Sequence, residues 1–286
     1  MAELVAASLD AVRRALREDR ASADATTRLL GATADQPVVA RFVAEGRGRF
    51  VVAGLPVAGA AVRELDPHVQ FPESAEGAWV GPGDVIAAVR CRAGAILSAE
   101  RVALNFLQRL SGIATATRRA VDAVAGTPAR ITHTRKTTPG LRALEQYAVR
   151  VGGGVDNRAS LAHAILWKDN HWAVLARDGG KHSLAATLRG APARGGMPLI
   201  VEVESDAQLE EALAAGVTHL LVDNQPPERV AAWVQRAGPG VTIQASGGIT
   251  LENARAYAEA GAALLAIGAL THSVSAAPIT CEIVND

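Results

Sequence analysis

The sequence contains little cysteine and few aromatic residues. Its two cysteines, Cys91 and Cys281, are too few for a disulfide framework or a cysteine metal cluster. This usage is typical of a protein in a reducing compartment. The aromatic content of 3% points to no particular function.

An excess of charge of one sign and long apolar runs are also absent. Lysine plus arginine and aspartate plus glutamate number 29 each, which excludes bulk attraction to nucleic acid or acidic membrane, so any basic site must be local. The longest apolar stretch, residues 50–62, contains two glycines and a proline and is shorter than the roughly 20 residues of a spanning helix. The first twenty residues lack a basic segment leading into an apolar one, as a signal peptide requires. We therefore expect a cytoplasmic protein.

The second half of the chain repeats one type of unit. Short apolar runs begin at Leu199, His219, Val241 and Ala263, about 20 residues apart, with amphipathic helical stretches between them. Two more strands are expected at residues 129–136 and 164–168. Each unit consists of a strand, a helix and a glycine that ends the helix. This alternation predicts βα units and a parallel sheet.

Polar residues recur at the carboxyl end of each expected strand, where a parallel α/β barrel builds its active site. These residues are Lys136, Lys168, Glu204, Asp223, Ser246 and Gly268. An open doubly wound sheet would concentrate them at one switch point, so the pattern favours a barrel. The first hundred residues instead predict a helix, strand-like runs and a strong helix from Ser98 to about Leu110. We expect an N-terminal α+β domain over 1–112 and a barrel domain over 113–272, with 273–286 packing back on the first.

Basic residues gather near the expected strand ends. They are Arg135, Lys136, Arg142, Arg158 and Lys168, and Arg101 begins the long N-terminal helix. In a chain without net charge this concentration predicts an anionic ligand with several charges, since arginine pairs with carboxylate and phosphate through two hydrogen bonds. The run 134–137, two hydroxyls and two cations before Pro-Gly, indicates a ligand loop.

Two carboxylates alternate with valines near the end of one strand. Glu202 and Glu204 therefore share a face, directed into the barrel or towards its mouth. Glu204 together with Asp223 could hold Mg²⁺ or stabilise a developing cation, with Lys136 or Lys168 as the counter-charge. The alternative, especially for Glu202, is a structural ion pair inside the barrel.

Glycines follow the two final strands, where barrels bind phosphate through backbone N–H groups. They form the segments Ser246-Gly247-Gly248 and Gly268-Ala269. The histidines show no spacing that marks a zinc site.

Seven motifs in order carry a resemblance to one family. They are ERVALNFLQRLSGIATAT at 100–117, HTRKTTPGLRALEQYAVRVGGG at 133–154, WKDNH at 167–171, VEVE at 201–204, VDN at 222–224, ASGGIT at 245–250 and IGALTHS at 267–273. Together they resemble quinolinate phosphoribosyltransferase, from about residue 15 to the end of the chain.

The resemblance implies an α/β protein with an N-terminal α+β sandwich domain, an incomplete parallel α/β barrel, and a homodimer. It implies transfer of phosphoribosyl from phosphoribosyl pyrophosphate (PRPP) to quinolinate with Mg²⁺, with loss of CO₂ to give nicotinate mononucleotide for NAD biosynthesis. No nucleic acid or membrane partner is implied.

Site roles follow from the same motifs. Arg101 would reach the partner subunit's site, while Arg135, Asn157, Arg158 and Lys168 would bind the substrate carboxylates. Lys136, Glu204 and Asp223 would be catalytic, the two carboxylates also serving the metal. Ser246, Gly247, Gly248 and Gly268 would bind phosphate.

Three positions depart from the family pattern. Asn157 stands where His is usual, Gln244 where Glu often precedes the SGG turn, and His133 where Asp or Gly is common. Three alternatives stay open: a paralogue acting on a different pyridine carboxylate, a Schiff-base lyase using Lys168, and a catalytically silent paralogue that only binds a phosphorylated ligand.

Overall fold

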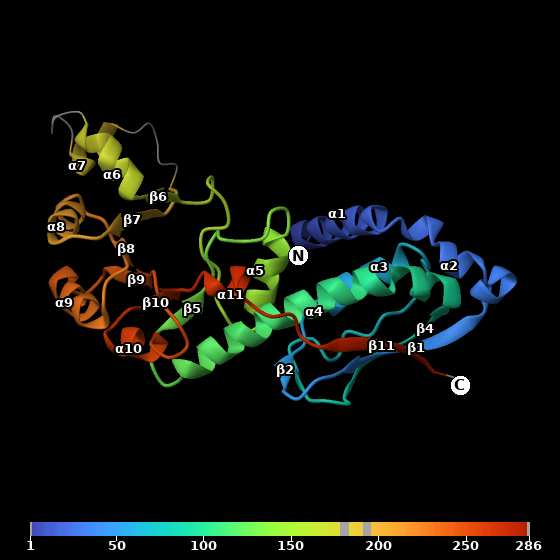
Figure 1. The fold of residues 1–286 in the computed structure, drawn as a ribbon. Helices are drawn as coiled ribbons and strands as arrows, with labels where there is room; N and C mark the ends of the chain where they lie inside the picture. Colours follow the sequence, from blue (N-terminus) through green and yellow to red (C-terminus); the bar gives the residue numbers. More distant parts are fainter. Residues whose placement is uncertain (1, 178–182, 191–195, 285–286) are drawn as a thin grey trace. The chain divides into compact units, whose positions relative to one another are not determined.

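A computed structural model describes residues 2–177, 183–190 and 196–284, which form two compact units. The first unit comprises Met1–Arg118, Thr137–Gly153 and Leu270–Asp286, and the second comprises Arg119–Lys136 and Gly154–Ala269. The chain therefore leaves the first unit and returns to it twice. Figure 1 shows the helices and strands with their labels.

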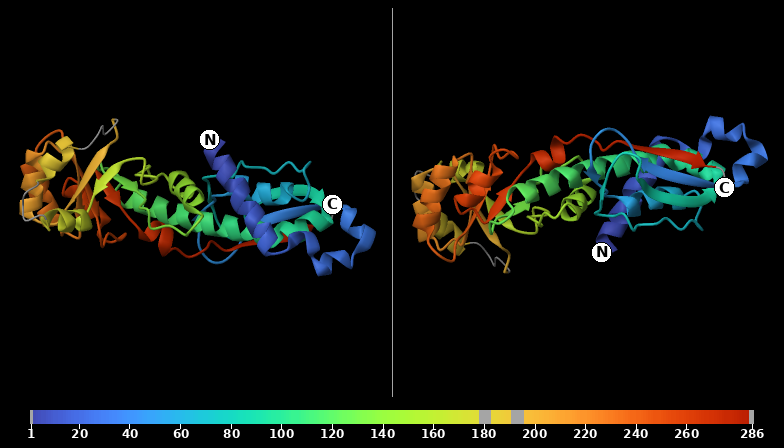
Figure 2. Two further views of the ribbon diagram at one scale, coloured as in Figure 1. Left: turned by 90° about the horizontal axis from the view of Figure 1, so that it is seen from above. Right: turned by 90° about the horizontal axis from the view of Figure 1, so that it is seen from below.

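The first unit is built on a three-stranded antiparallel sheet of order β11-β1-β4. The strands of this sheet are β1 (Pro37–Ala44), β4 (Val85–Arg92) and β11 (Ile279–Val284). The first unit also contains a separate two-stranded sheet of β2 (Phe50–Val51) and β3 (Trp79–Val80). Its helices are α1 (Ala2–Glu18), η1 (Ala21–Ala23), α2 (Ala25–Arg28), η2 (Gly31–Asp35), α3 (Leu55–Arg63) and α5 (Arg142–Val151), together with most of α4 (Ala93–Ala123). Figures 1 and 2 show β11 beside β1, to which it pairs from Ala44↔Ile279 to Val39↔Val284.

Alternation of apolar and polar residues explains which face of this sheet is buried. In β4, Ala87, Val89 and Cys91 are buried, while Ala88, Arg90 and Arg92 are exposed. The buried side chains join Phe42 of β1 and Leu107 of α4 in one continuous core. The first unit therefore has its own hydrophobic core, typical of an independent domain.

Helix α5 belongs to the first unit because its apolar face is buried there. Leu144, Ala148 and Val149 are at most 1% exposed and lie in the first unit's core. Gly152, at the end of α5, lies so close to α4 that a Cβ would stand 2.5 Å from the Ala114 carbonyl oxygen. Residues 137–153, expected in the barrel domain, are grouped with the N-terminal elements in the structure.

The second unit contains a six-stranded parallel sheet of order β5-β10-β9-β8-β7-β6. The strands are β5 (Arg130–Thr132), β6 (Ile165–Trp167), β7 (Leu199–Val203), β8 (His219–Asp223), β9 (Thr242–Ser246) and β10 (Leu264–Ala266). The helices are α6 (Asp169–Ala176), α7 (Leu184–Gly190), α8 (Asp206–Ala214), α9 (Pro227–Ala237), α10 (Ala254–Glu259) and, at the junction with the first unit, α11 (Ala269–His272). Figure 1 shows α8, α9 and α10 around the outside of these strands.

The last strand, β10, pairs with the first, β5, as in a barrel, whereas β5 and β6 are the two edges of the sheet, so the barrel is incomplete. The predicted α/β fold, with an N-terminal α+β domain and a parallel sheet, is thus confirmed. Because all six strands are parallel, their carboxyl ends lie at one edge of the sheet. Within the described ranges, no helix is both long and apolar enough to cross a membrane.

Candidate active site

A cavity of about 380 Å³ lies at the carboxyl ends of the parallel strands. Seven of the residues predicted for the site line it: Arg135, Lys136, Asn157, Arg158, Lys168, Asp223 and Ser246. They come from five different places in the sheet, after β5, before and after β6, and at the ends of β8 and β9. We name this space the strand-end cavity.

The cations of the cavity come from the loops that flank β5 and β6. The guanidinium of Arg158 donates to the Ala164 carbonyl oxygen at 3.3 Å. Burial, and then the positive charge of Arg135, lower the pKa of Arg158. In the part of the chain that the structure describes, the buried Nε of Arg135 has no hydrogen-bond partner. Two neighbouring guanidiniums, one with an unused buried donor, are suited to a ligand with carboxylates.

Carboxylates of β7 and β8 face the same space from the other side. Oxygen atoms of Glu202, Glu204 and Asp223 lie within 4.8 Å of one another. Glu202 lines the cavity, and its Oε2 is 3.8 Å from Nζ of Lys168. Burial raises the pKa of Glu202, while the charge of Lys168 opposes that rise. A set of three carboxylates offers the oxygen ligands that Mg²⁺ prefers.

Glu202 is more central to the cavity than the sequence analysis assumed. Sequence reasoning gave Glu204 the chemical role and left Glu202 as a candidate structural ion pair. In the structure Glu204 is exposed, whereas Glu202 is 7% exposed and accepts a hydrogen bond from the Asp169 N–H at 3.4 Å. The alternation of residues in β7 correctly predicts that both side chains share one face. It does not predict how deeply each one is buried in the cavity.

One residue of the cavity lining, Gln244, pairs with a histidine on the neighbouring strand. Gln244 of β9 is 1% exposed, and its Oε1 lies 3.0 Å from Nε2 of His219 on β8. Burial lowers the pKa of His219, which favours a neutral imidazole. The sequence analysis noted Gln244 as a departure but could not connect it with His219, because the pairing depends on strand register.

The glycines predicted to bind phosphate lie just beyond Ser246 and β10. Gly247 and Gly248 have φ values of 82° and 62°, a conformation that favours glycine. Gly248 O accepts a hydrogen bond from Nδ2 of Asn253 at 2.9 Å, which holds the loop before α10. These two glycines and Gly268 do not line the strand-end cavity itself, among the residues described.

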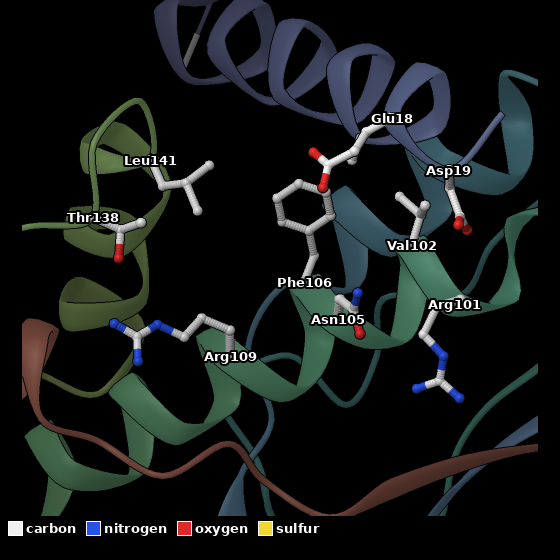
Figure 3. A pocket seen from close by; sticks show the side chains of 10 residues that line it. Glu18, Asp19, Arg101, Val102, Asn105, Phe106, Arg109, Thr138 and Leu141 are labelled. Carbon is white, nitrogen blue, oxygen red and sulfur yellow. The ribbon is translucent and has the colours of Figure 1, made fainter. Parts of the chain in front are cut away.

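Arg101 lies in the first unit, on α4. It is exposed, and its guanidinium forms no hydrogen bond or ion pair within the described residues. Figure 3 shows it at the edge of a hollow of about 520 Å³, where the side chains of Glu18 and Phe106 lie near one another and Arg101 turns away from α1.

Comparisons with known proteins point to one family. The model of the quinolinate phosphoribosyl transferase N-terminal domain matches residues 24–111, and that of the C-terminal domain matches residues 113–281. The chain is 42% identical to a nicotinate-nucleotide pyrophosphorylase [carboxylating] of Mycobacterium leprae, covering 94% of each chain. It is 40% identical to a probable enzyme of the same name from Bacillus subtilis, covering 93% of this chain and 90% of the relative.

A solved structure agrees with these matches. The nicotinate-nucleotide pyrophosphorylase of Francisella tularensis superimposes with a TM-score of 0.85 at 29% identity, covering 98% of this chain and 97% of that one.

Proposed function

Because the chain belongs to the quinolinate phosphoribosyltransferase family, we propose that it transfers phosphoribosyl from PRPP to quinolinate. The products are nicotinate mononucleotide, pyrophosphate and CO₂, a step of NAD biosynthesis. The observation that carries the proposal is the pair of neighbouring guanidiniums, Arg135 and Arg158, opposite the carboxylates of β7 and β8. A ligand with two carboxylates suits the first group, and a developing sugar cation suits the second.

Binding of the pyridine acid falls to the cations of the cavity. Arg135, Arg158 and Lys168 face the carboxylates of quinolinate, and Asn157 lies beside them. Lys136 lies where it can contact either the acid or PRPP. Ser246 and the glycine backbone after β9 and β10 offer N–H groups to the phosphate of the ribose. This division orients the ring nitrogen towards the sugar.

The transfer step displaces pyrophosphate from the anomeric carbon and forms the bond to the ring nitrogen. Positive charge develops on the sugar, and Glu204 and Asp223 stabilise it electrostatically. Glu202, Glu204 and Asp223 fit Mg²⁺ as oxygen ligands. The chemistry that the ion supplies there is neutralisation of the leaving pyrophosphate.

Decarboxylation follows from the new charge on the ring. Once ribosylated, the pyridinium nitrogen is cationic and electrostatically stabilises the electron pair that the departing CO₂ leaves on the adjacent ring carbon. A proton then replaces the carboxylate. No protein nucleophile is required, in agreement with a cavity lined by cations, carboxylates and amides.

A second candidate keeps the reaction and changes the acid. Asn157 and Gln244 line the cavity with neutral amides, where the family often has His and Glu. This difference in charge is compatible with a related pyridine carboxylate as the substrate. The Schiff-base alternative is disfavoured, because the chain belongs to a phosphoribosyltransferase family and Nζ of Lys168 is in an ion pair with Oε2 of Glu202 at 3.8 Å.

The experiment incubates the protein with Mg²⁺, PRPP and either quinolinate or nicotinate, identifies products by mass and follows CO₂ release. Nicotinate mononucleotide with CO₂ from quinolinate alone supports the proposal. Product from a different pyridine acid only would favour the second candidate.

A further inference from the structure

A buried histidine joins the two segments that carry the cavity's arginines. His133, directly after β5, is 0% exposed. Its Nε2 accepts a hydrogen bond from the Asn157 N–H at 3.3 Å, and its carbonyl oxygen accepts one from Nδ2 of Asn157 at 3.1 Å. We name this pair of hydrogen bonds, both donated by Asn157 and accepted by His133, the His133–Asn157 link.

The Asn157 side chain is occupied by this link and by its own backbone. Its Oδ1 accepts from the N–H of Arg158 at 2.7 Å, while Nδ2 donates to His133. The amide therefore connects the backbone of His133 with that of Arg158. This geometry describes a residue that shapes the cavity wall through its neighbours.

The two arginines need such a constraint. Arg135 follows His133 by two residues, and Arg158 follows Asn157 directly. They are close enough for the charge of Arg135 to lower the pKa of Arg158, so the two guanidiniums repel each other. Without a ligand, the repulsion favours separation of the segments that carry them, and the link opposes it.

We propose that His133 and Asn157 are positioning residues that hold Arg135 and Arg158 together for a ligand with two adjacent carboxylates. A vicinal dicarboxylate neutralises both guanidiniums at once, whereas a monocarboxylate leaves one of them unpaired. This inference deepens the proposed function and rests on it for the identity of the natural ligand, a pyridine with neighbouring carboxylates.

The test uses equilibrium binding to the full chain by calorimetry, with benzene-1,2-dicarboxylate (phthalate) and benzoate as the probes. Neither probe has a ring nitrogen, so neither can accept ribose and binding is measured apart from the reaction. Asn157→Ala removes the side-chain hydrogen bond of the link, from Nδ2 to the His133 carbonyl oxygen, and keeps the backbone one. Thr127→Ala is the matched control, because the Thr127 hydroxyl also forms two backbone hydrogen bonds in the same unit, to Val124 O and from Ala129 N.

We expect the wild-type protein to prefer phthalate over benzoate. Asn157→Ala should weaken phthalate binding about 10-fold, the effect of about one lost hydrogen bond on a charged site, and benzoate binding by about 3-fold or less. Thr127→Ala should leave both affinities unchanged. A preference that survives in Asn157→Ala overturns the inference, as does a wild-type protein without any preference.

A second variant keeps the proposal testable if Asn157→Ala does not fold. His133→Gln retains a side-chain acceptor for the Asn157 N–H and should keep most of the preference for phthalate, whereas His133→Leu should lose it. Equal behaviour of these two variants overturns the inference. Turnover of quinolinate and PRPP by the wild-type protein is measured separately. A preference for phthalate without any turnover would contradict the proposed function, but it would still support the positioning role of His133 and Asn157.

Discussion

At the scale of single residues, the strand-end cavity separates charges that the sequence mixes evenly. Arg135, Arg158 and Lys168 come from the loops around β5 and β6, while Glu202 and Asp223 come from β7 and β8. A chain of zero net charge thereby has one cationic wall and one anionic wall in the same cavity. This arrangement suits two substrates of opposite requirement, a dicarboxylate and a sugar that becomes cationic.

Replacement of Arg158 by glutamine tests the cationic wall. Arg158→Gln removes a charge-assisted hydrogen bond worth about 1.5–3 kcal/mol, so KM for quinolinate should rise about 10- to 100-fold. KM for PRPP should change little, and steady-state kinetics with each substrate varied in turn measures both. Arg229→Gln is the control, since Arg229 pairs with Asp206 on the surface. Equal effects on both KM values would contradict a selective role in binding the acid.

Glu202 links the chemistry of the cavity to its stability. Burial raises the pKa of Glu202, so the folded protein holds this proton to a higher pH than the unfolded chain does. The favourable contribution to folding is therefore fully present below the unfolded pKa of about 4.3 and declines as pH rises through the raised folded value. Near neutral pH the ionised carboxylate is a cost to folding that function requires.

Glu202→Gln should remove that cost and also the activity. We expect Tm at pH 7 to rise by about 2 °C relative to the wild type, and this advantage to vanish near pH 4. Turnover should fall at least about 10-fold. Thermal unfolding from pH 4 to pH 7 measures the first effect, with the exposed Glu204→Gln as a stability control. A lower Tm at pH 7 would mean that the pair with Lys168 outweighs desolvation.

At the scale of elements, the local pattern predicted the βα repeats and not the long-range groupings. The apolar runs at Leu199, His219, Val241 and Ala263 correspond to β7, β8, β9 and β10, because strand and helix periods are local properties. The pairing of β1 with β11 joins segments more than 200 residues apart, and nothing local encodes it. The same holds for α5, whose amphipathic face shows that it is buried but not against which core.

The candidate site was predictable to a similar extent. Strand-end residues such as Lys168 and Asp223 are found from the pattern, since parallel strands bring their carboxyl ends together. The His219–Gln244 contact and the His133–Asn157 link could not be found, because each joins side chains across strands or loops whose register is a tertiary property.

The loop after β9, which we propose to bind phosphate, has a backbone shape that only glycine fits. Gly247 has φ of 82°, and a Cβ there would stand 2.1 Å from Oδ1 and 2.8 Å from the backbone N of Asn224. No side chain fits that gap without moving the backbone after β8, which follows Asp223 directly. The two loops are therefore coupled at this contact.

Gly247→Ala should therefore displace both loops. We expect KM for PRPP to rise about 10-fold and stability to fall by about 1–3 kcal/mol, measured by kinetics and by chemical unfolding. Gly126→Ala is the matched control, because Gly126 has φ of 83° with nothing within 4 Å of the added Cβ. It isolates the strain of the backbone conformation from the steric clash. Equal effects of both variants would contradict the coupling of the two loops.

At the scale of the whole molecule, the remaining question is where Arg101 acts. Arg101 is exposed, and its guanidinium forms no hydrogen bond or ion pair with another described residue. It lies in the other compact unit from the strand-end cavity. The family resemblance implies a homodimer in which this arginine completes the partner's site. A closed two-fold dimer exchanges such residues reciprocally, so each site depends on both chains.

Mixing two inactive variants tests this arrangement. In a dimer of Arg101→Ala chains, each cavity is intact but receives no arginine from its partner. In a dimer of Lys136→Ala chains, the arginine is supplied but each cavity lacks its lysine. In a mixed dimer, the cavity of the Arg101→Ala chain receives the normal arginine of its partner. One of the two sites of that dimer is therefore restored. Random re-pairing of equal amounts makes about half of the dimers mixed, which predicts about one quarter of wild-type activity. If Arg101 acted within its own chain, or if the protein did not dimerise, mixing would restore nothing, and sedimentation of the same samples distinguishes these two cases.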